Sequence, residues 1–184
     1  MAKDWFTNYR MESRQLLYQE DFNYAYQRTD MSFIVGKRSG FSTKIAGGYQ
    51  VILLDEELIH RFIQQFHLAK KYQNLKLNHR IQTDQTFVPN AENTYRLRYR
   101  LSSEIPLNGH TLDLKEMFLK VNHEYLNALS DVTYGLEIRL AAFLGYAFSS
   151  RSKFEIGIDN RLDQFVEDRS RNRFWLGINI YQSL

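Results

Sequence analysis

A run of seven residues, Tyr95 to Leu101, alternates aromatic or aliphatic side chains with arginine. On a β-strand successive side chains point to opposite faces, so Arg96, Arg98 and Arg100 share one face and apolar side chains cover the other. Arginine binds carboxylates and phosphates through a planar, two-pronged guanidinium group. A face of three arginines therefore predicts either ion pairs with buried acids or an electrostatic site for anions.

The same alternation continues along most of the chain and collects roughly thirteen basic and eight acidic residues on one face. The principal members of this predicted lumen charge network are Arg80, Asp84, Arg96, Arg98, Arg100, Glu116, Glu124, Glu137, Arg139, Glu155, Asp159 and Arg161. Arginines paired with carboxylates across strands would fill a narrow barrel. Arg98→Ala would then leave buried acids without partners and lower the stability of the barrel by about 3–5 kcal/mol. The alternative is an open lumen that attracts anions.

Histidines are the next candidates for chemistry, and the five are His60, His67, His79, His110 and His123. None has the His-x-x-x-His or His-Glu-x-x-His spacing of a helical zinc site, and the chain has no cysteine. His79 has apolar neighbours on its face but no serine beside it. His123 and Glu124 point to opposite faces of one strand and cannot form a dyad. The sequence predicts no catalytic residue, metal site or cofactor.

Composition narrows the class of protein. The chain has 184 residues, of which 43% are hydrophobic and 15% aromatic, and its net charge is +3. This is sufficient for a single folded domain, predicted over residues 1–184. No run approaches the ~18 apolar residues of a membrane helix. The small positive excess forms no basic arm, so no nucleic-acid partner is expected.

Ten strands joined as hairpins are predicted. Their ranges are 5–18, 22–35, 42–53, 60–71, 75–87, 94–107, 112–126, 132–148, 153–165 and 173–181. Gly40 and the pair Asn108-Gly109 predict tight turns. Such strands are longer than the ~5–6 residues usual in soluble sheets and long enough for the ~9–11 residues of a tilted membrane strand.

The apolar faces of these strands favour a membrane barrel, in which they contact lipid while charged faces line a polar lumen. An outward apolar band is predicted to contain Leu136, Ile138, Leu140, Phe154, Ile156, Leu176 and Ile178. The alternative is a soluble, lipocalin-like barrel with the apolar face inward around a hydrophobic ligand. The two arrangements place the arginines on opposite sides of the wall.

Several segments also carry a family resemblance. They are Phe22-Asn23-Tyr24, His79-Arg80, Tyr95 to Leu101 followed by Ile105-Pro106-Leu107, Asn122-His123-Glu124-Tyr125 and Phe174-Trp175-Leu176-Gly177. Together they resemble the domain-of-unknown-function 2490 family, over nearly the whole chain. The resemblance implies a bacterial outer-membrane barrel without an assigned reaction, and it carries over no catalytic residues. The final Leu184 departs from the aromatic residue that ends many such barrels.

These observations predict an all-β fold, a single antiparallel up-and-down transmembrane β-barrel of about ten strands with a charged lumen. The expected role is structural, or that of a subunit in an envelope assembly, with a mostly plugged lumen. The expected location is the bacterial outer membrane, with the sequence being a mature chain without its signal peptide. Expected partners are membrane lipids and other outer-membrane proteins. Three alternatives stay open: a narrow anion-favouring channel, a lipid-modifying or proteolytic outer-membrane enzyme, and the soluble barrel.

Overall fold

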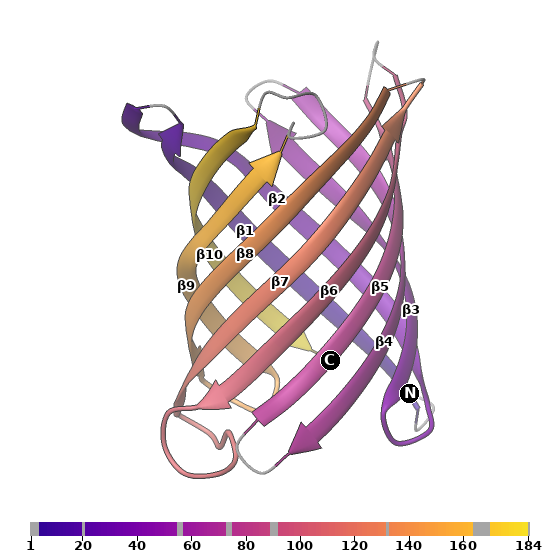
Figure 1. Ribbon diagram of the computed structural model, residues 1–184. Helices are drawn as coiled ribbons and strands as arrows, with labels where there is room; N and C mark the ends of the chain where they lie inside the picture. Colours follow the sequence, from indigo (N-terminus) through magenta and orange to yellow (C-terminus); the bar gives the residue numbers. More distant parts are fainter. Residues whose placement is uncertain are drawn as a thin grey trace.

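The computed structural model describes residues 4–19, 21–54, 57–72, 75–88, 92–131, 133–163 and 170–183. Ten antiparallel strands form a sheet that closes into a barrel (Figure 1). The strands are β1 Trp5–Gln19, β2 Asp21–Ser39, β3 Thr43–Leu54, β4 Glu57–Tyr72, β5 Leu75–Phe87, β6 Thr94–Pro106, β7 Met117–Ser130, β8 Thr133–Ala147, β9 Ser152–Asp163 and β10 Arg171–Ser183. Within the described residues, no helix is long and apolar enough to cross a membrane.

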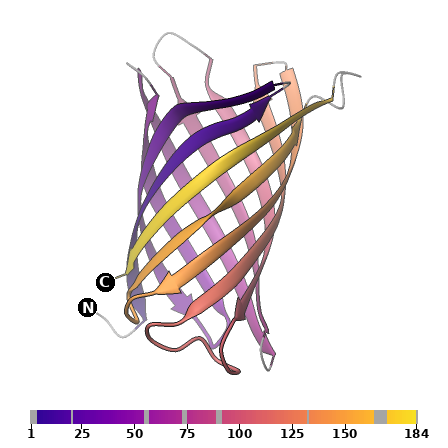
Figure 2. The same cartoon turned by 90° about the vertical axis from the view of Figure 1, so that its left-hand side faces the viewer.

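The topology is up-and-down throughout. Each strand pairs with its neighbours in the sequence, and β1 pairs with β10 to close the wall. β1 begins and β10 ends at the same end of the barrel, where Asn8 is the register partner of Ser183 (Figure 2). We call this the terminal end. The closed ten-stranded barrel confirms the predicted fold class.

One connection differs from the sequence prediction. Residues 107–116 form a loop, so β7 begins at Met117 and not at residue 112, and Asn108-Gly109 does not form a two-residue hairpin. The cause is hydrogen bonding to a different strand. Lys115 N donates to the carbonyl of Ala147 at the end of β8, and Ala147 N donates to the carbonyl of Glu116. These bonds hold the end of the loop against β8, and Leu107 N, just after β6, donates to the carbonyl of Met117 at the start of β7.

The wall is apolar outside and charged inside. On β6, Arg98 is 7% exposed whereas its neighbour Leu97 is 50% exposed. On β8, Arg139 is buried whereas Leu140 is 56% exposed. The predicted apolar band lies on the outer face, with Leu136, Ile138, Phe154, Leu176 and Ile178 half-buried between neighbouring side chains and Ile156 exposed. A soluble barrel with an apolar interior requires the opposite arrangement, so the structure contradicts that alternative.

Aromatic rings fill part of the lumen beside glycine residues. The ring of Phe118 on β7 is fully buried and covers the backbone of Gly145 on β8. Phe143 lies in the same way over Gly157 on β9 and Gly177 on β10. Glycine leaves the space that a ring from a nearby strand occupies, so these positions need a residue without a Cβ.

We expect Gly157→Ala to lower the free energy of unfolding by about 1–3 kcal/mol through overpacking. The added Cβ would overlap Phe143 and the carbonyl oxygen of Ala142, which belongs to the backbone of β8. Urea unfolding in detergent micelles measures the change. Gly135→Ala is the matched control, because no atom lies within 4 Å of its added Cβ. Equal unfolding midpoints for the two variants would contradict this account of the packing.

Candidate functional site

Ion pairs occupy the inner face of the barrel. Those of the described residues join fifteen basic side chains to nine carboxylates. The pleat that turns apolar residues outward turns these charges inward. Basic groups outnumber acids, and seven of the nine carboxylates pair with two or more of them, whereas Glu155 and Asp159 each pair with one.

Glu124 on β7 is the most shared carboxylate and is 1% exposed. Arg100 Nε on β6 donates a hydrogen bond to it at 2.7 Å, and Arg80 on β5 donates another at 3.1 Å. Arg139 on β8 donates at 3.3 Å, and Arg98 lies 4.0 Å away. The register makes Arg100 and Arg139 the direct partners of Glu124 on its two sides. One acid therefore joins four strands.

Asp84 on β5 is the centre of a second cluster. Arg96 Nε donates to it at 2.6 Å, Arg98 Nε lies 2.9 Å away, and Arg61 Nε of β4 lies 3.6 Å away. Arg98 contacts both Asp84 and Glu124 and so links the two clusters.

A third cluster lies on β1 and β2. Glu12 accepts hydrogen bonds from Arg10 and Arg14, at 2.5 Å and 2.7 Å. Arg14 also lies 3.1 Å from Asp30, as does Arg28. Both carboxylates are buried, and Arg14 joins β1 to β2 through Asp30.

Further pairs lie on β7 to β9, and Asp163 at the end of β9 pairs with Arg171 and Arg173 on β10. Arg161 donates to Asp159 at 2.5 Å and lies 3.8 Å from Glu137. Lys120 donates to the buried Glu155 at 2.7 Å. Among the described residues, every strand except β3 supplies at least one member of an ion pair.

Every predicted member of the charge network except Glu116 takes part in a described ion pair. Glu116 precedes β7, and its carboxylate accepts a hydrogen bond from the backbone of Asp113 in the 107–116 loop. Sequence reasoning missed Glu104, which pairs with Lys76 and Lys153. Glu104 continues the even-numbered alternation of the arginines on β6, so the same pattern predicts that its side chain faces the lumen.

Outward-facing histidines pair with tyrosines on the outer wall. His79 Nδ1 lies 2.9 Å from the hydroxyl of Tyr99, and His60 Nδ1 is hydrogen-bonded to Tyr49. Neither bond leads to a serine or a carboxylate. The described residues hold no group of three or more His, Asp or Glu side chains suited to a metal ion.

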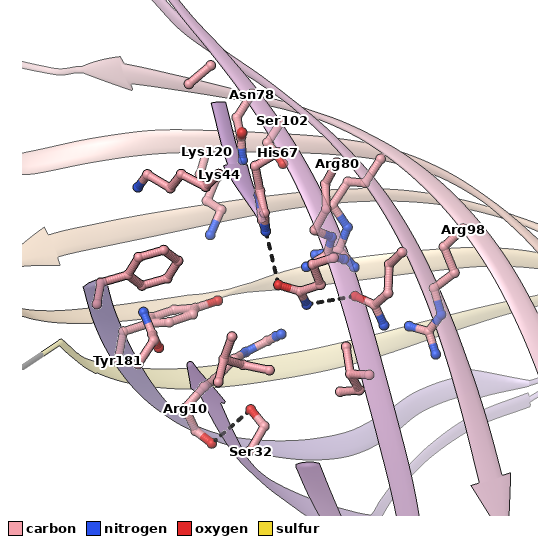
Figure 3. Close-up of a pocket in the computed structure, with 18 of the residues that line it drawn as sticks. Arg10, Ser32, Lys44, His67, Asn78, Arg80, Arg98, Ser102, Lys120 and Tyr181 are labelled. Carbon is pink, nitrogen blue, oxygen red and sulfur yellow. Dashed lines mark hydrogen bonds between the residues drawn. The ribbon is translucent and has the colours of Figure 1, made fainter. Parts of the chain in front are cut away.

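Two cavities lie in the lumen and differ greatly in size. A cavity of about 330 Å³ occupies the terminal end, and Figure 3 shows Lys44, His67, Arg80 and Lys120 among the side chains around it. The next cavity, toward the middle of the barrel, holds only about 30 Å³. We call these the terminal cavity and the central cavity. Paired charges fill the lumen where it narrows.

The closed wall, apolar outside and ion-paired inside, defines a β-barrel with the polarity expected of a membrane barrel. A family described as protein of unknown function (DUF2490) matches residues 2–174. The match covers most of the chain, so this protein belongs to the DUF2490 family, which confirms the resemblance seen in the sequence. No curated protein matches the sequence significantly.

Solved structures are similar to this chain at low sequence identity. LpxR from Salmonella typhimurium is 8% identical, with a TM-score of 0.53 over 96% of this chain and 99% of that chain. Outer-membrane expressed OmpT of Vibrio cholerae is 9% identical, with a TM-score of 0.49 over 97% of both chains. The likeness to LpxR shows a common barrel fold. It says nothing about activity, because one fold hosts many functions.

The shared carboxylates predict an asymmetry between acidic and basic substitutions. Glu124→Gln removes the negative charge that four arginines share, so we expect the free energy of unfolding to fall by about 3–5 kcal/mol. Arg98→Met should cost less, about 1.5–3 kcal/mol, because Asp84 and Glu124 both keep other arginine partners. This revises the large loss that the sequence suggested for Arg98. Urea unfolding in micelles compares the variants, and an equal or larger loss for Arg98→Met would contradict the shared-acid arrangement.

Proposed function

We propose that this protein is an integral β-barrel of the bacterial outer membrane whose lumen is closed by ion pairs. Its role in this proposal is structural, as an element of the envelope or a subunit of a larger assembly. The observation that carries the proposal is the polarity of the wall: each of the ten strands exposes at least one large hydrophobic side chain, while Asp30, Asp84, Glu124 and other acids of the network are buried.

The outer face supports a lipid environment. Soluble monomers rarely expose contiguous apolar patches of more than a few hundred Å². Here exposed apolar residues surround the barrel, for example Phe62, Leu97, Leu140 and Ile158 on four different strands. Strands of 12 to 19 residues exceed the ~9–11 residues that cross a bilayer at a tilt. Membrane lipids and other outer-membrane proteins are the partners that this surface suits.

The inner face supports a closed lumen. Glu124, Asp84 and Asp30 each bind arginines from neighbouring strands, and the central cavity holds about 30 Å³. Opening a path would separate buried charge pairs, which is costly in a low-dielectric interior. A plug of this kind favours a structural role over a channel.

Location is tested by fractionating a Gram-negative host that expresses the protein. We expect it in the outer-membrane fraction, resistant to extraction by carbonate and with heat-modifiable gel migration. Recovery in the soluble fraction would contradict the proposal.

A charged residue on the outer wall tests contact with lipid. Leu140→Arg places a guanidinium at the middle of β8, and in a bilayer this should cost about 2–4 kcal/mol of stability. Leu114→Arg is the matched control, since Leu114 is 60% exposed on the 107–116 loop, outside the strands. Unfolding by urea in lipid vesicles compares the two. A water-exposed wall would leave both variants as stable as the original protein.

Planar-bilayer recordings test the closed lumen. Paired charges leave only the small central cavity at the middle of the lumen, so we expect no steady conductance from the inserted protein. Large, stable single-channel steps with anion selectivity would contradict the plug and support the anion-channel alternative.

A further inference from the structure

We infer that the terminal cavity is a binding site for a small polyanion, a compound that carries two or more phosphate groups or similar anionic groups. This goes beyond the structural role proposed above. It depends on the folded barrel but not on the protein's location or assembly.

The charge of the lumen is unevenly distributed. The central cavity is lined by Arg10, Arg14, Arg100 and Arg139 and by four acids, so its wall is balanced. Among the described residues, the terminal cavity is lined by nine basic side chains and one carboxylate, that of Glu104. Its basic residues are Arg10, Arg14, Lys44, Arg61, Lys76, Arg80, Arg98, Arg100 and Lys120. The excess positive charge of the network is therefore concentrated where the lumen has space.

Apart from Glu104, which pairs with Lys76, the acids that pair with these basic groups do not face the terminal cavity. Four carboxylates that lie outside the cavity lining bind its arginines and Lys120. They belong to Glu12, Asp84, Glu124 and Glu155. Like charges held close together in a low-dielectric enclosure repel one another, and an anion in the space between them relieves that repulsion. A polyanion would neutralise several of them at once.

Hydrogen-bond donors without protein partners point to a ligand. Lys44 forms no ion pair among the described residues, and its ammonium lies 5.2 Å from the ring centre of Phe6. The Nε groups of Arg10 and Arg80 are buried without a hydrogen-bond partner among the described residues. Lining residues thus retain donors that oxygen atoms of a phosphate group would satisfy.

The wall of the cavity is held in place by a chain of side-chain hydrogen bonds. His67 is bonded to Gln65 at 3.0 Å, Gln65 donates to Gln82 at 2.9 Å, and Gln82 donates to Asp84 at 3.1 Å. Figure 3 shows His67 at the start of this chain, beside the cavity. The polar wall is thereby fixed to the ion pairs at the middle of the barrel. A wall ordered in advance reduces the cost of binding.

The size and access of the cavity suit a small ligand. Its volume of about 330 Å³ lies at the lower end of the roughly 300–1,000 Å³ usual for ligand sites. Lys76 and Glu104 also line a second hollow, of about 520 Å³, formed with the 107–116 loop. A ligand would reach the terminal cavity from the terminal end, where this hollow adjoins it. The paired charges around the small central cavity would prevent passage through the barrel. The site is therefore blind.

Calorimetric titration of the full chain, folded in a neutral detergent, tests the site. We expect saturable binding of inorganic tripolyphosphate at about 50 mM salt, weakening as salt screens the charges. Orthophosphate should bind about tenfold or more weakly, because it satisfies fewer of the donors. A wild-type protein that shows no saturable binding of tripolyphosphate would overturn the inference.

Two lysine variants locate the bound anion. Lys44→Gln removes a cavity charge without leaving a described acid unpaired, and we expect it to weaken tripolyphosphate binding about tenfold. Lys37→Gln makes the same change at an exposed site on β2 outside the cavity lining, and it should leave the affinity unchanged. Heat-modifiable migration verifies that both variants fold. Equal affinities in the two variants would place the anion elsewhere on the surface and overturn the inference.

The same titration in nanodiscs distinguishes two sources of phosphate. If the natural ligand is a free phosphorylated compound, nanodiscs of anionic and zwitterionic lipids should give equal affinities. Weaker binding in anionic nanodiscs would assign the site to a phosphorylated lipid headgroup, with the same cavity chemistry. A failure of binding leaves the fractionation and conductance results unaffected, so the two proposals fail separately.

Discussion

The pairing of buried carboxylates with several arginines is the interaction on which the rest of this structure depends. In a narrow closed barrel about half of the strand residues point into an interior that water cannot freely fill. An unpaired charge there lowers the stability of the fold. Glu124, Asp84 and Asp30 each accept guanidinium groups from more than one strand or position. The cross-strand register brings these partners opposite each other, so the ion pairs and the hydrogen-bond ladder stabilise the same pairing of strands.

The excess of basic groups gives the lumen two regions. Where acids and arginines are equal in number, side chains fill the space, as in the central cavity. Where the acids lie behind the arginines, a larger cavity remains and its wall is strongly positive. A closed middle and a cationic end are therefore consequences of one charge distribution. Both follow from where the few carboxylates lie along the strands.

The outer wall follows from the same alternation. On β6 each inward arginine has an outward apolar neighbour, as Arg98 has Leu97, so a charged lumen and an apolar exterior arise together. This polarity supports the membrane location that we propose. Membership of the DUF2490 family and the fold shared with LpxR agree with a barrel. They add no reaction, because one fold hosts many functions.

The sequence alone determined most of the strand positions and their two faces, and it named many of the side chains in the described ion pairs, although not Glu104, Lys153, Asp163, Arg171 or Arg173. A period of two is a local property, and the Tyr95 to Leu101 run displays it without reference to other strands. Local signals were weaker at the 107–116 loop. Asn108-Gly109 predicted a tight turn. Backbone hydrogen bonds that Ala147 on β8 makes with residues 115 and 116 decided the path of the chain instead.

Only the tertiary structure decided which arginines share which acid and where the lumen stays open. Asn8 and Ser183 are 175 residues apart in sequence and yet lie side by side where β1 meets β10. Arg10 likewise reaches Asn179 across this closure. Contacts of this kind depend on strand tilt and on the register around the whole barrel. The alternation of residues in one strand carries no information about either.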